Sequence, residues 1–217
     1  ELENSSLLSV TGELLAAGRS VSNITGDEVI VALLGCGMDS AANEAIAWGA
    51  NRVYVVEDPL LSMTHIDAQL AAFENVCRQV QPSIVLVGKT SAGTEIGPRL
   101  AFRMGAGVAQ DCVGLKVDQN SQRIIATRPV YGGNAMASVA FAETDPQVVV
   151  VRTKIFEPLD PDPSRDGAVE TIRTNLDPGV IRYRLVETIT HKAKGVRLED
   201  APVVVGGGRG LGGPESF

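Results

Sequence analysis

Short apolar runs alternate with helical repeats along the first hundred residues. Three runs, Val29–Leu34, Arg52–Val56 and Ser83–Val87, are rich in β-branched residues and almost continuously apolar. Strands have this character when both faces of their sheet are covered. Alternation of such strands with helices is typical of βαβ units joined by right-handed crossovers. The pattern therefore predicts an α/β domain with a mostly parallel sheet between two layers of helices.

Two stretches between or after these runs carry a single apolar stripe each. Their apolar residues recur every three or four positions, as on one helix face. The first stripe consists of Ile66, Leu70, Phe73, Cys77 and Val80, and the second of Ile96, Leu100 and Met104. Pro98 lies in the second stripe, and we expect it near the start of that helix, where a missing N–H does no harm.

The pattern changes after Gly105. Brief strand-like runs separated by turn-forming residues predict an antiparallel or mixed extension of the sheet. These runs are Leu115–Val117, Arg123–Arg128, Ser138–Phe141 and Gln147–Arg152. The segment Glu157–Gly167 holds three prolines and is predicted to be an exposed loop. Ile181–Leu185 alternates cleanly and is predicted to return as an edge strand.

Both ends of the chain suggest incomplete domains. A helix over Glu13–Ala17 is predicted with no strand before it, and Pro202–Val205 predicts a new strand shortly before Phe217. We therefore expect a first domain over residues 1–192 that lacks its first strand. Residues 193–217 would form a linker and the truncated start of a second α/β domain.

Composition and charge exclude several classes of protein. Of 217 residues, 44% are hydrophobic and 21% charged, which suits a globular domain. The net charge of −7 argues against nucleic acid as a partner, because such binding depends on basic residues that neutralise phosphates. We expect no transmembrane segment and no secretory signal, since no apolar run reaches the required length. Cys36, Cys77 and Cys112 are too scattered for a zinc site or a disulfide framework, which fits a reduced, cytoplasmic setting.

The segment Val203–Gly213 holds the most specific local chemistry. A strand that enters a glycine-rich turn exposes backbone N–H groups, and Arg209 adds a planar cation with several donors. The turn therefore suits a phosphate or pyrophosphate. The alternative is a flexible glycine turn with a solvated arginine, and the spacing alone does not choose between them.

A second candidate is Thr127–Met136. Arg128 and Tyr131 could lie at a cofactor or subunit contact. We favour a plain hairpin whose arginine pairs with a nearby carboxylate, because no second group converges on it.

The remaining polar residues suggest structural roles. Ser91 or Thr94 is expected to cap a helix, with anion binding as the second interpretation. His65 and His191 have no neighbour that would orient them as a base, and Cys36 is expected to be a small packing residue. No catalytic motif is present in the sequence.

Two segments, taken together, identify a family. Thr127–Ala137 reads T-R-P-V-Y-G-G-N-A-M-A, and about seventy residues later Val203–Phe217 opens with V-V-V-G-G-G-R-G-L. In this order they resemble the alpha subunit of electron transfer flavoproteins, where a T-R-P-x-Y-x-G-N-A segment closes the first domain and a G-G-R-G-L segment opens the flavin domain. Lys89–Leu100 and Asp145–Arg152 fall in the expected order, so the resemblance covers most of the chain.

The resemblance implies a heterodimer of alpha and beta subunits that holds one FAD. Such a protein is an electron carrier and not an enzyme: it accepts electrons from flavin dehydrogenases and delivers them to a quinone oxidoreductase or a similar acceptor. The first domain would be a three-layer α/β unit similar to adenine nucleotide alpha hydrolase-like folds and would act as a scaffold. Arg209 matches the family arginine that contacts FAD. The later flavin-contacting motifs are absent, so residues 1–217 are expected to bind FAD poorly or not at all.

Two other functions remain open. A free-standing nucleotide-binding module resembling universal stress proteins has the same alternation of strands and helices, and it would bind AMP or ATP unaided. The start of a nicotinamide-dependent oxidoreductase is the other, with Gly208, Gly210 and Gly213 as its fingerprint. That fingerprint also needs a following helix and an acidic residue about 20 positions further on.

Overall fold

The computed structural model describes residues 2–3, 6–35, 37–62, 65–183, 186–187, 201, 203–213 and 215. The chain divides into two compact units, Glu1–Arg182 and Tyr183–Phe217. The expected domain boundary between residues 192 and 193 lies outside the described residues, so it stays a prediction.

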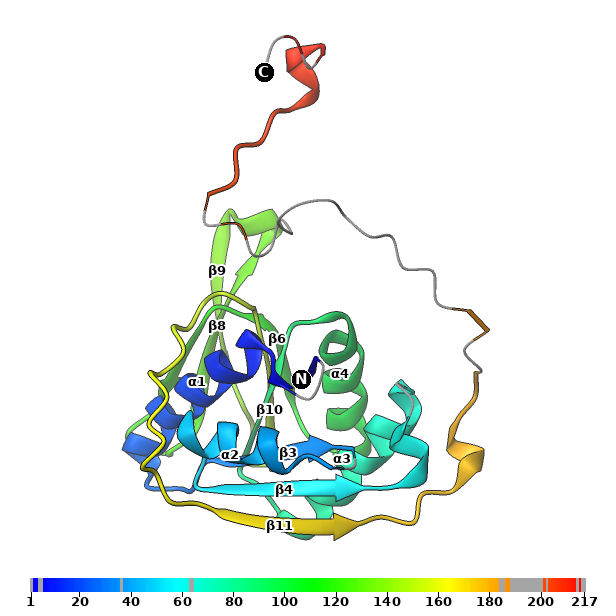
Figure 1. Cartoon of the computed structure of the whole chain (residues 1–217). Coiled ribbons are helices and arrows are strands. Elements are labelled where there is room, and N and C mark those ends of the chain that lie inside the picture. Colours follow the sequence, from blue (N-terminus) through cyan, green and yellow to red (C-terminus); the bar gives the residue numbers. More distant parts are fainter. Residues whose placement is uncertain are drawn as a thin grey trace. The chain divides into compact units, whose positions relative to one another are not determined.

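The larger unit is built on two sets of parallel strands. In the first set the order is β11 (Ala168–Arg173), β4 (Arg52–Glu57) and β3 (Ile30–Leu34). In the second it is β5 (Ile84–Gly88), β10 (Gln147–Val151) and β6 (Val108–Cys112). Figure 1 shows β3, β4 and β11 side by side. The three strands predicted from apolar runs are therefore confirmed, as is their parallel arrangement.

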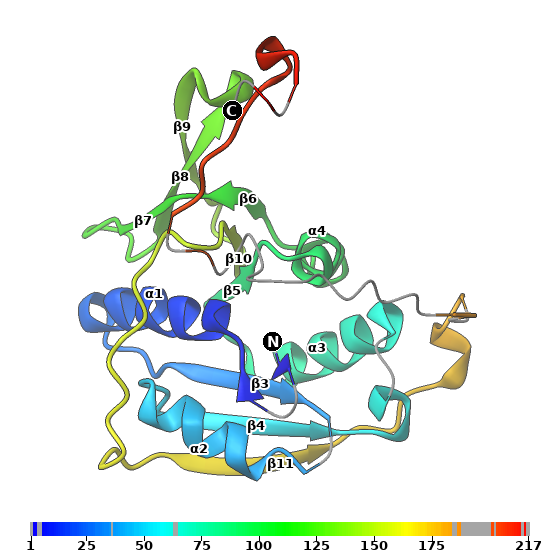
Figure 2. The same cartoon turned by 45° about the horizontal axis from the view of Figure 1, so that its top comes forward.

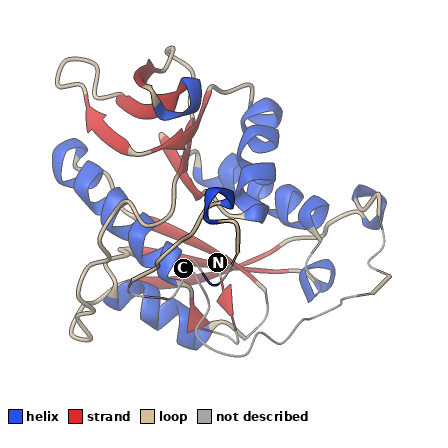
Figure 3. Ribbon diagram, turned by 90° about the horizontal axis from the view of Figure 1, so that it is seen from above, coloured by secondary structure: helices blue, strands red, loops and turns tan. Residues whose placement is uncertain are grey.

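Four helices cover these strands. They are α1 (Ser9–Thr25), α2 (Asp39–Ala47), α3 (Ile66–Val80) and α4 (Ser91–Met104). Leu33 and Val55 pack in one core cluster with residues of α1 and α2, whereas Val56 packs with α3. Because successive side chains of a strand point to opposite faces, α1 and α2 cover one face and α3 the other. Helices flank the strands on both sides, so the α/β class predicted from the sequence is confirmed (Figure 3).

An antiparallel sheet adjoins the parallel strands. It consists of β7 (Gly114–Val117), β8 (Ile124–Val130) and β9 (Ala135–Ala140), in that order. The buried Ile124 and Ala126 of β8 join a core cluster with residues of β6 and β10. In Figure 2 the β8–β9 hairpin extends away from the parallel strands. The antiparallel extension is therefore confirmed for three of the four predicted runs.

The fourth run, Gln147–Arg152, is confirmed as a strand, but it lies at the centre of a parallel sheet and not in an extension of it. Residues Gln147–Val151 form β10, which lies between β5 and β6 and is parallel to both. All five of its residues are buried. A run of four valines suits a central parallel strand, because both of its faces are covered.

The prediction of an edge strand at Ile181–Leu185 is wrong for residues 181–183, because these residues are irregular. Residues 184 and 185 lie outside the described part of the chain. The edge position beside β4 belongs to β11 instead. Residues 181–183 follow a short 3-10 turn at Pro178–Val180, and the backbone N–H of Arg182 donates a hydrogen bond to a side chain of α3.

The exposed loop predicted at 157–167 is confirmed, because those residues form neither helix nor strand.

Two expectations about α4 need correction. The helix begins at Ser91 because Thr90, rather than Ser91 or Thr94, is the N-cap: its Oγ1 accepts a hydrogen bond of 3.1 Å from the Gly93 N–H. Pro98 consequently lies in the interior of α4 and not near its start. There the missing N–H leaves a carbonyl one turn earlier without its usual helical partner.

The ends of the first unit are less regular. The sequence predicted no strand before α1, but the described residues form two antiparallel strands of two residues each there, β1 (Leu2–Glu3) and β2 (Ser6–Leu7). The helix predicted at Glu13–Ala17 is confirmed as part of α1. Within the described residues, no helix combines the length and apolar character needed to cross a bilayer.

Candidate functional site

The glycine–arginine turn belongs to the smaller unit. Arg209–Leu211 forms a short 3-10 turn that starts after an extended Gly208. It is closed by hydrogen bonds from the Leu211 N–H to the Gly208 carbonyl, 3.1 Å, and from the Gly212 N–H to the Arg209 carbonyl, 3.2 Å. The turn is therefore a defined local structure, although all of its residues are exposed.

The turn leaves room for a ligand beside the backbone. A Cβ atom added at Gly206, Gly208 or Gly210 would meet nothing within 4 Å. Among the described residues no carboxylate lies within ion-pair distance of Arg209, so its guanidinium donors are available. This geometry suits a phosphate better than a turn packed against its own chain would.

The strand expected before this turn is wrong in the described residues. Val203, Val204 and Val205 are irregular and exposed, by 78%, 57% and 76% respectively, while Pro202 lies outside the described part. A strand forms only where another strand pairs with it. No described strand pairs with this run of valines, so the apolar sequence alone does not produce the predicted structure.

The second candidate segment forms the hairpin that we favoured. Its tip is a 3-10 turn at Tyr131–Gly133 in which Tyr131, Gly132 and Gly133 all have positive φ. The Asn134 side-chain amide donates to the Tyr131 carbonyl at 2.9 Å and holds the turn. The glycines thus supply the backbone conformation for which their sequence positions argue.

Arg128 and Tyr131 do not converge on one site. Arg128 shares the β8 face of the buried Ala126, and its Nε is buried without a hydrogen-bond partner. The carboxylate partner predicted for Arg128 is not found among the residues that the structure describes, so this pairing stays a prediction. Tyr131 is 85% exposed at the tip. Its exposure fits the subunit-contact alternative better than a role inside a pocket.

A charged cluster lies at the carboxyl ends of β5, β10 and β6. Arg152 Nε and Nη2 donate to the two carboxylate oxygens of Asp111, both at 2.8 Å, and Lys89 Nζ lies 2.7 Å from Asp111 Oδ1. The Arg152 hydrogen bonds, followed by those of Lys89, hold the pKa of Asp111 far below its usual value despite partial burial. No local pattern in the sequence indicated this cluster, although each member falls at or next to the end of a strand. We interpret this cluster as a set of ion pairs that links the ends of the three strands.

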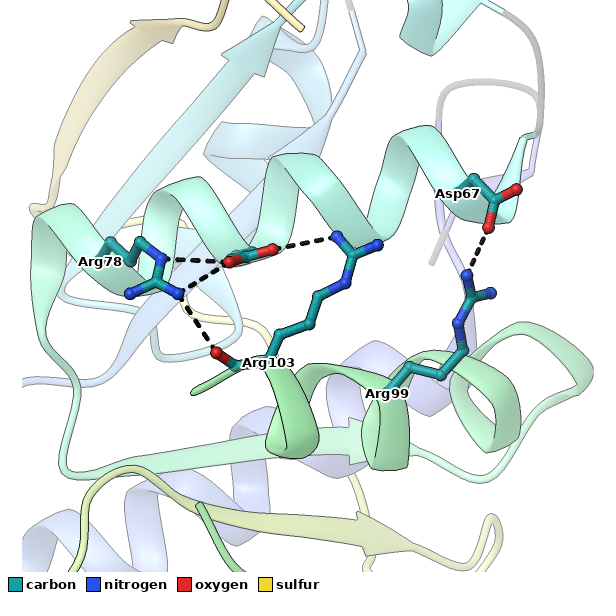
Figure 4. A network of polar contacts seen from close by, with 5 residues as sticks. Asp67, Arg78, Arg99 and Arg103 are labelled. Carbon is teal, nitrogen blue, oxygen red and sulfur yellow. Dashed lines mark hydrogen bonds and ion pairs between the residues drawn. The ribbon is translucent and has the colours of Figure 1, made fainter. Parts of the chain in front are cut away.

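Helices α3 and α4 are joined by a second polar network (Figure 4). Glu74 accepts hydrogen bonds from Arg78 Nη2 at 2.9 Å and from Arg103 Nη1 at 3.0 Å. Burial alone would raise the pKa of Glu74, but the two arginines lower it. Asp67 accepts a hydrogen bond from Arg99, which is the main reason that its pKa is lowered.

A polar hollow of about 320 Å³ adjoins this network. It is lined by Asp67, Arg99, Arg103, Asp177, Gly179, Val180 and Arg182. Arg99 and Arg103 are each paired with a carboxylate, so the hollow offers little uncompensated positive charge. This arrangement ties the two helices together and is not a strong anion site.

The histidine and the two cysteines that the structure describes are all buried. His65 is buried at the N-cap of α3, whereas His191 and Cys36 lie outside the described part. Burial raises the pKa of Cys77 and of Cys112 to about 11, and both are free thiols. No group of three or more potential metal ligands occurs among the described residues.

Comparisons with known proteins point in one direction. Residues 1–176 match the family model of the electron transfer flavoprotein domain. The chain is 37% identical, over 97% of its length, to an electron transfer flavoprotein subunit alpha from Megasphaera elsdenii, of which the match covers 62%. It is 33% identical over its whole length to the corresponding subunit from Thermoanaerobacterium thermosaccharolyticum, of which the match covers 66%. The chain thus spans just under two thirds of the length of these relatives.

A third relative carries a different name. The chain is 32% identical, over 93% of its length, to the LctC subunit of a lactate dehydrogenase (NAD(+),ferredoxin) from Acetobacterium woodii. The match covers 48% of that protein.

Proposed function

The chain belongs to the electron transfer flavoprotein family, as an alpha subunit, and from this membership we propose that it serves as an electron carrier in a larger flavoprotein. The observation that carries the proposal is the extent of the match. The family model covers every parallel strand of the first unit, and the relatives align through the glycine–arginine turn as well.

FAD is the cofactor that we assign to the intact protein. Arg209 and the unobstructed glycines before and after it would hold a phosphate of FAD through guanidinium and backbone N–H donors. When bound, FAD supplies the chemistry of electron acceptance and release. One exposed turn cannot bury a cofactor of this size, so residues 1–217 alone are proposed not to retain it.

The first unit is proposed to be a scaffold. Its titratable clusters pair with one another: Asp111 is held by Lys89 and Arg152, and Asp67 by Arg99. Residues tied in this way stabilise strand ends and helix pairs. We therefore propose a non-enzymatic role for this unit, in which it supports a beta subunit and the flavin-binding part of the protein.

We propose flavin dehydrogenases as electron donors and a quinone oxidoreductase or a similar acceptor as the recipient. The name of the third relative supports a wider choice of partners within this group of proteins, because it is a subunit of a lactate dehydrogenase that uses NAD(+) and ferredoxin. We thus propose the class of protein that donates electrons and the class that accepts them, and not individual proteins.

The test requires the complete polypeptide together with its beta subunit. We expect the purified complex to hold one FAD and its flavin absorbance to bleach when a substrate-loaded flavin dehydrogenase is added without oxygen. If the spectrum of oxidised flavin returns after an acceptor is added, electrons pass both into the flavin and out of it. A complex that holds FAD but is not reduced by any such dehydrogenase would contradict the carrier role.

A further inference from the structure

The chain leaves the first unit through a short strap, Thr174–Arg182, which follows strand β11. Two buried carboxylates hold this strap at different points along its length. Asp58 comes directly after β4 and is 3% exposed, and Asp67 lies in the first turn of α3. The strap is therefore attached to the first unit at two places, which can be compared.

The attachment at Asp58 is reinforced by apolar packing. One carboxylate oxygen of Asp58 accepts hydrogen bonds from the Leu176 N–H at 2.9 Å and from the Thr174 hydroxyl at 3.1 Å. The Thr174 N–H also donates to the Glu57 carbonyl at 3.1 Å, and the Leu176 side chain packs against the core cluster beneath α3. Release of this part would break several hydrogen bonds and expose apolar surface at once, so we expect it to stay closed.

The attachment at Asp67 lacks such support. Residues 177–182 begin with a 3-10 turn whose first hydrogen bond is internal, from the Gly179 N–H to Asp177 Oδ1 at 3.0 Å. The Arg182 N–H then donates to Asp67 Oδ2 at 3.3 Å. The buried clusters of the described residues include no side chain from this part of the strap. Its closure therefore depends on polar contacts.

A polar hollow of about 320 Å³ lies between this turn and helices α3 and α4. Residues on both sides line it: Asp177, Gly179, Val180 and Arg182 from the strap, and Asp67, Arg99 and Arg103 from the helices. Because these walls are polar and not close-packed against each other, opening of the turn gives up few apolar contacts. Arg99 holds Asp67 from α4, so the acceptor stays in place when the turn moves (Figure 4). The Asp67 attachment can thus open and close again without unfolding either helix.

We infer that Asp67 is a positioning residue that acts as a releasable latch: it holds Arg182 when closed, and its opening frees residues 177–182 while Asp58 keeps Thr174–Leu176 in place. Opening adds six residues to the connection with the flavin-binding part that follows, or at most about 20 Å of reach. The inference rests on the proposed function, because a carrier has to present its cofactor first to a donor and then to an acceptor. The closed latch restricts the positions open to the flavin-binding part, and the open latch widens them.

The first test is native-state hydrogen exchange of the complete wild-type alpha–beta complex. The amides of Val180 and Ile181 should exchange through a local opening, at rates that do not change with low concentrations of urea. The Leu176 amide should exchange only by global unfolding, at a rate that rises with urea. Two such classes of amide within one strap are what separate attachments predict.

The second test removes the latch alone. Arg182→Pro deletes the N–H that Asp67 accepts, and the extended conformation of Ile181 suits a residue before proline. We expect Val180 and Ile181 to exchange at least about tenfold faster, with the exchange of Leu176 unchanged. Arg182→Ala is the matched control, because it keeps the N–H, and it should exchange like the wild type.

A third measurement asks whether the latch affects the carrier. In complexes with bound FAD, a saturating amount of substrate-loaded flavin dehydrogenase should reduce the flavin of Arg182→Pro at least about twofold faster than that of the wild type, because the open state no longer has to form first. The concentration of dehydrogenase at half the maximal rate should stay the same. A variant that was merely damaged would not transfer electrons faster.

The outcomes separate the latch from the proposed function. If Val180, Ile181 and Leu176 exchange together in the wild type, the strap opens as one piece and the latch is wrong. If they exchange separately but Arg182→Pro is reduced at the wild-type rate, Asp67 does not restrict the flavin-binding part, so the inference fails while the proposed function stands. If no flavin dehydrogenase reduces the wild-type complex, the proposed function fails, and the carrier role of the latch fails with it. If Arg182→Pro does not fold, the wild-type exchange pattern decides: separate opening supports the latch and joint opening overturns it.

Discussion

Asp67, in the first turn of α3, accepts a hydrogen bond from the backbone N–H of Arg182, 115 residues later in the sequence. Its other carboxylate oxygen accepts from Arg99 on α4. The side chain of Asp67 is only 8% exposed. One buried carboxylate thus joins two helices to the last residue of the first unit, so it fixes the point at which the chain leaves that unit.

Substitution of Asp67 should destabilise the first unit. Asp67→Asn removes the charge that Arg99 needs as its partner, and we expect the free energy of unfolding to fall by about 2 kcal/mol. Glu95→Gln is the matched control, because Glu95 pairs with the same arginine but is 53% exposed. That variant should lose about 0.5 kcal/mol or less. Urea unfolding measures the free energy of unfolding of both variants. Equal losses in the two variants would mean that the burial of Asp67 does not strengthen its contribution to stability.

The ion pairs of Asp111 should make the free energy of unfolding fall when the pH becomes acidic. The pKa of Asp111 is lowered in the folded state, so its contribution is present above the unfolded pKa of about 3.9 and is lost as the pH falls toward the folded value. Asp111 has a φ of 62°, which asparagine tolerates well, so Asp111→Asn removes the charge without added backbone strain. The variant should be less stable at pH 7 by about 2 kcal/mol.

That difference in the free energy of unfolding should narrow by about 1 kcal/mol between pH 7 and pH 3, because the unfolded wild-type chain takes up a proton at Asp111 in this range, whereas the folded protein keeps the carboxylate ionised and the asparagine variant has nothing to titrate there. Unfolding by urea at several pH values between these limits measures the difference. A gap that stays constant across the range would contradict the assignment of a lowered pKa to Asp111.

Much of the parallel sheet could be predicted from the sequence because burial on both faces leaves a local signature. Val29–Leu34 and Ser83–Val87 are apolar at nearly every position, and both lie in the parallel strands. The same reasoning misplaced β10, because four consecutive valines show that a strand is buried but not which strands lie beside it. Strand β11 went unrecognised because an exposed edge strand such as Ala168–Arg173 carries polar residues and lacks that signature.

The glycine–arginine turn shows the other limit of sequence reasoning. Its residue types predict a turn at Gly208–Gly212, and a turn is present. The strand predicted before it depended on a pairing partner, which no local pattern can guarantee. The charged cluster at Asp111 was missed for a related reason: Lys89, Asp111 and Arg152 are far apart in the sequence, and only the strand order β5–β10–β6 brings them together.

Two glycines in helices should respond oppositely to substitution by alanine. A Cβ at Gly93, in the first turn of α4, would lie 1.9 Å from the backbone carbonyl oxygen of Gly88, which cannot move without disturbing β5. We expect Gly93→Ala to cost about 3 kcal/mol in the free energy of unfolding. A Cβ at Gly18, inside α1, would meet Val29 at an ordinary 3.5 Å, so Gly18→Ala should stabilise the helix by about 0.5–1 kcal/mol. Thermal unfolding should give melting temperatures on opposite sides of the wild type; a stable Gly93→Ala variant would show that α4 does not approach β5 so closely.

Arg209 should matter for FAD only when the rest of the flavin site is present. Residues 1–217 alone should purify without colour, because the exposed turn buries too little of the cofactor; a stoichiometric flavin spectrum would contradict this.

In the complete alpha–beta complex, Arg209→Ala removes a charge-assisted contact to phosphate, and the Kd for FAD should rise about tenfold. Arg173→Ala is the control, since the Arg173 side chain is 85% exposed on β11 and should leave the Kd unchanged. Titration of the apoprotein with FAD measures both, and equal affinities would mean that the glycine–arginine turn does not contact the cofactor.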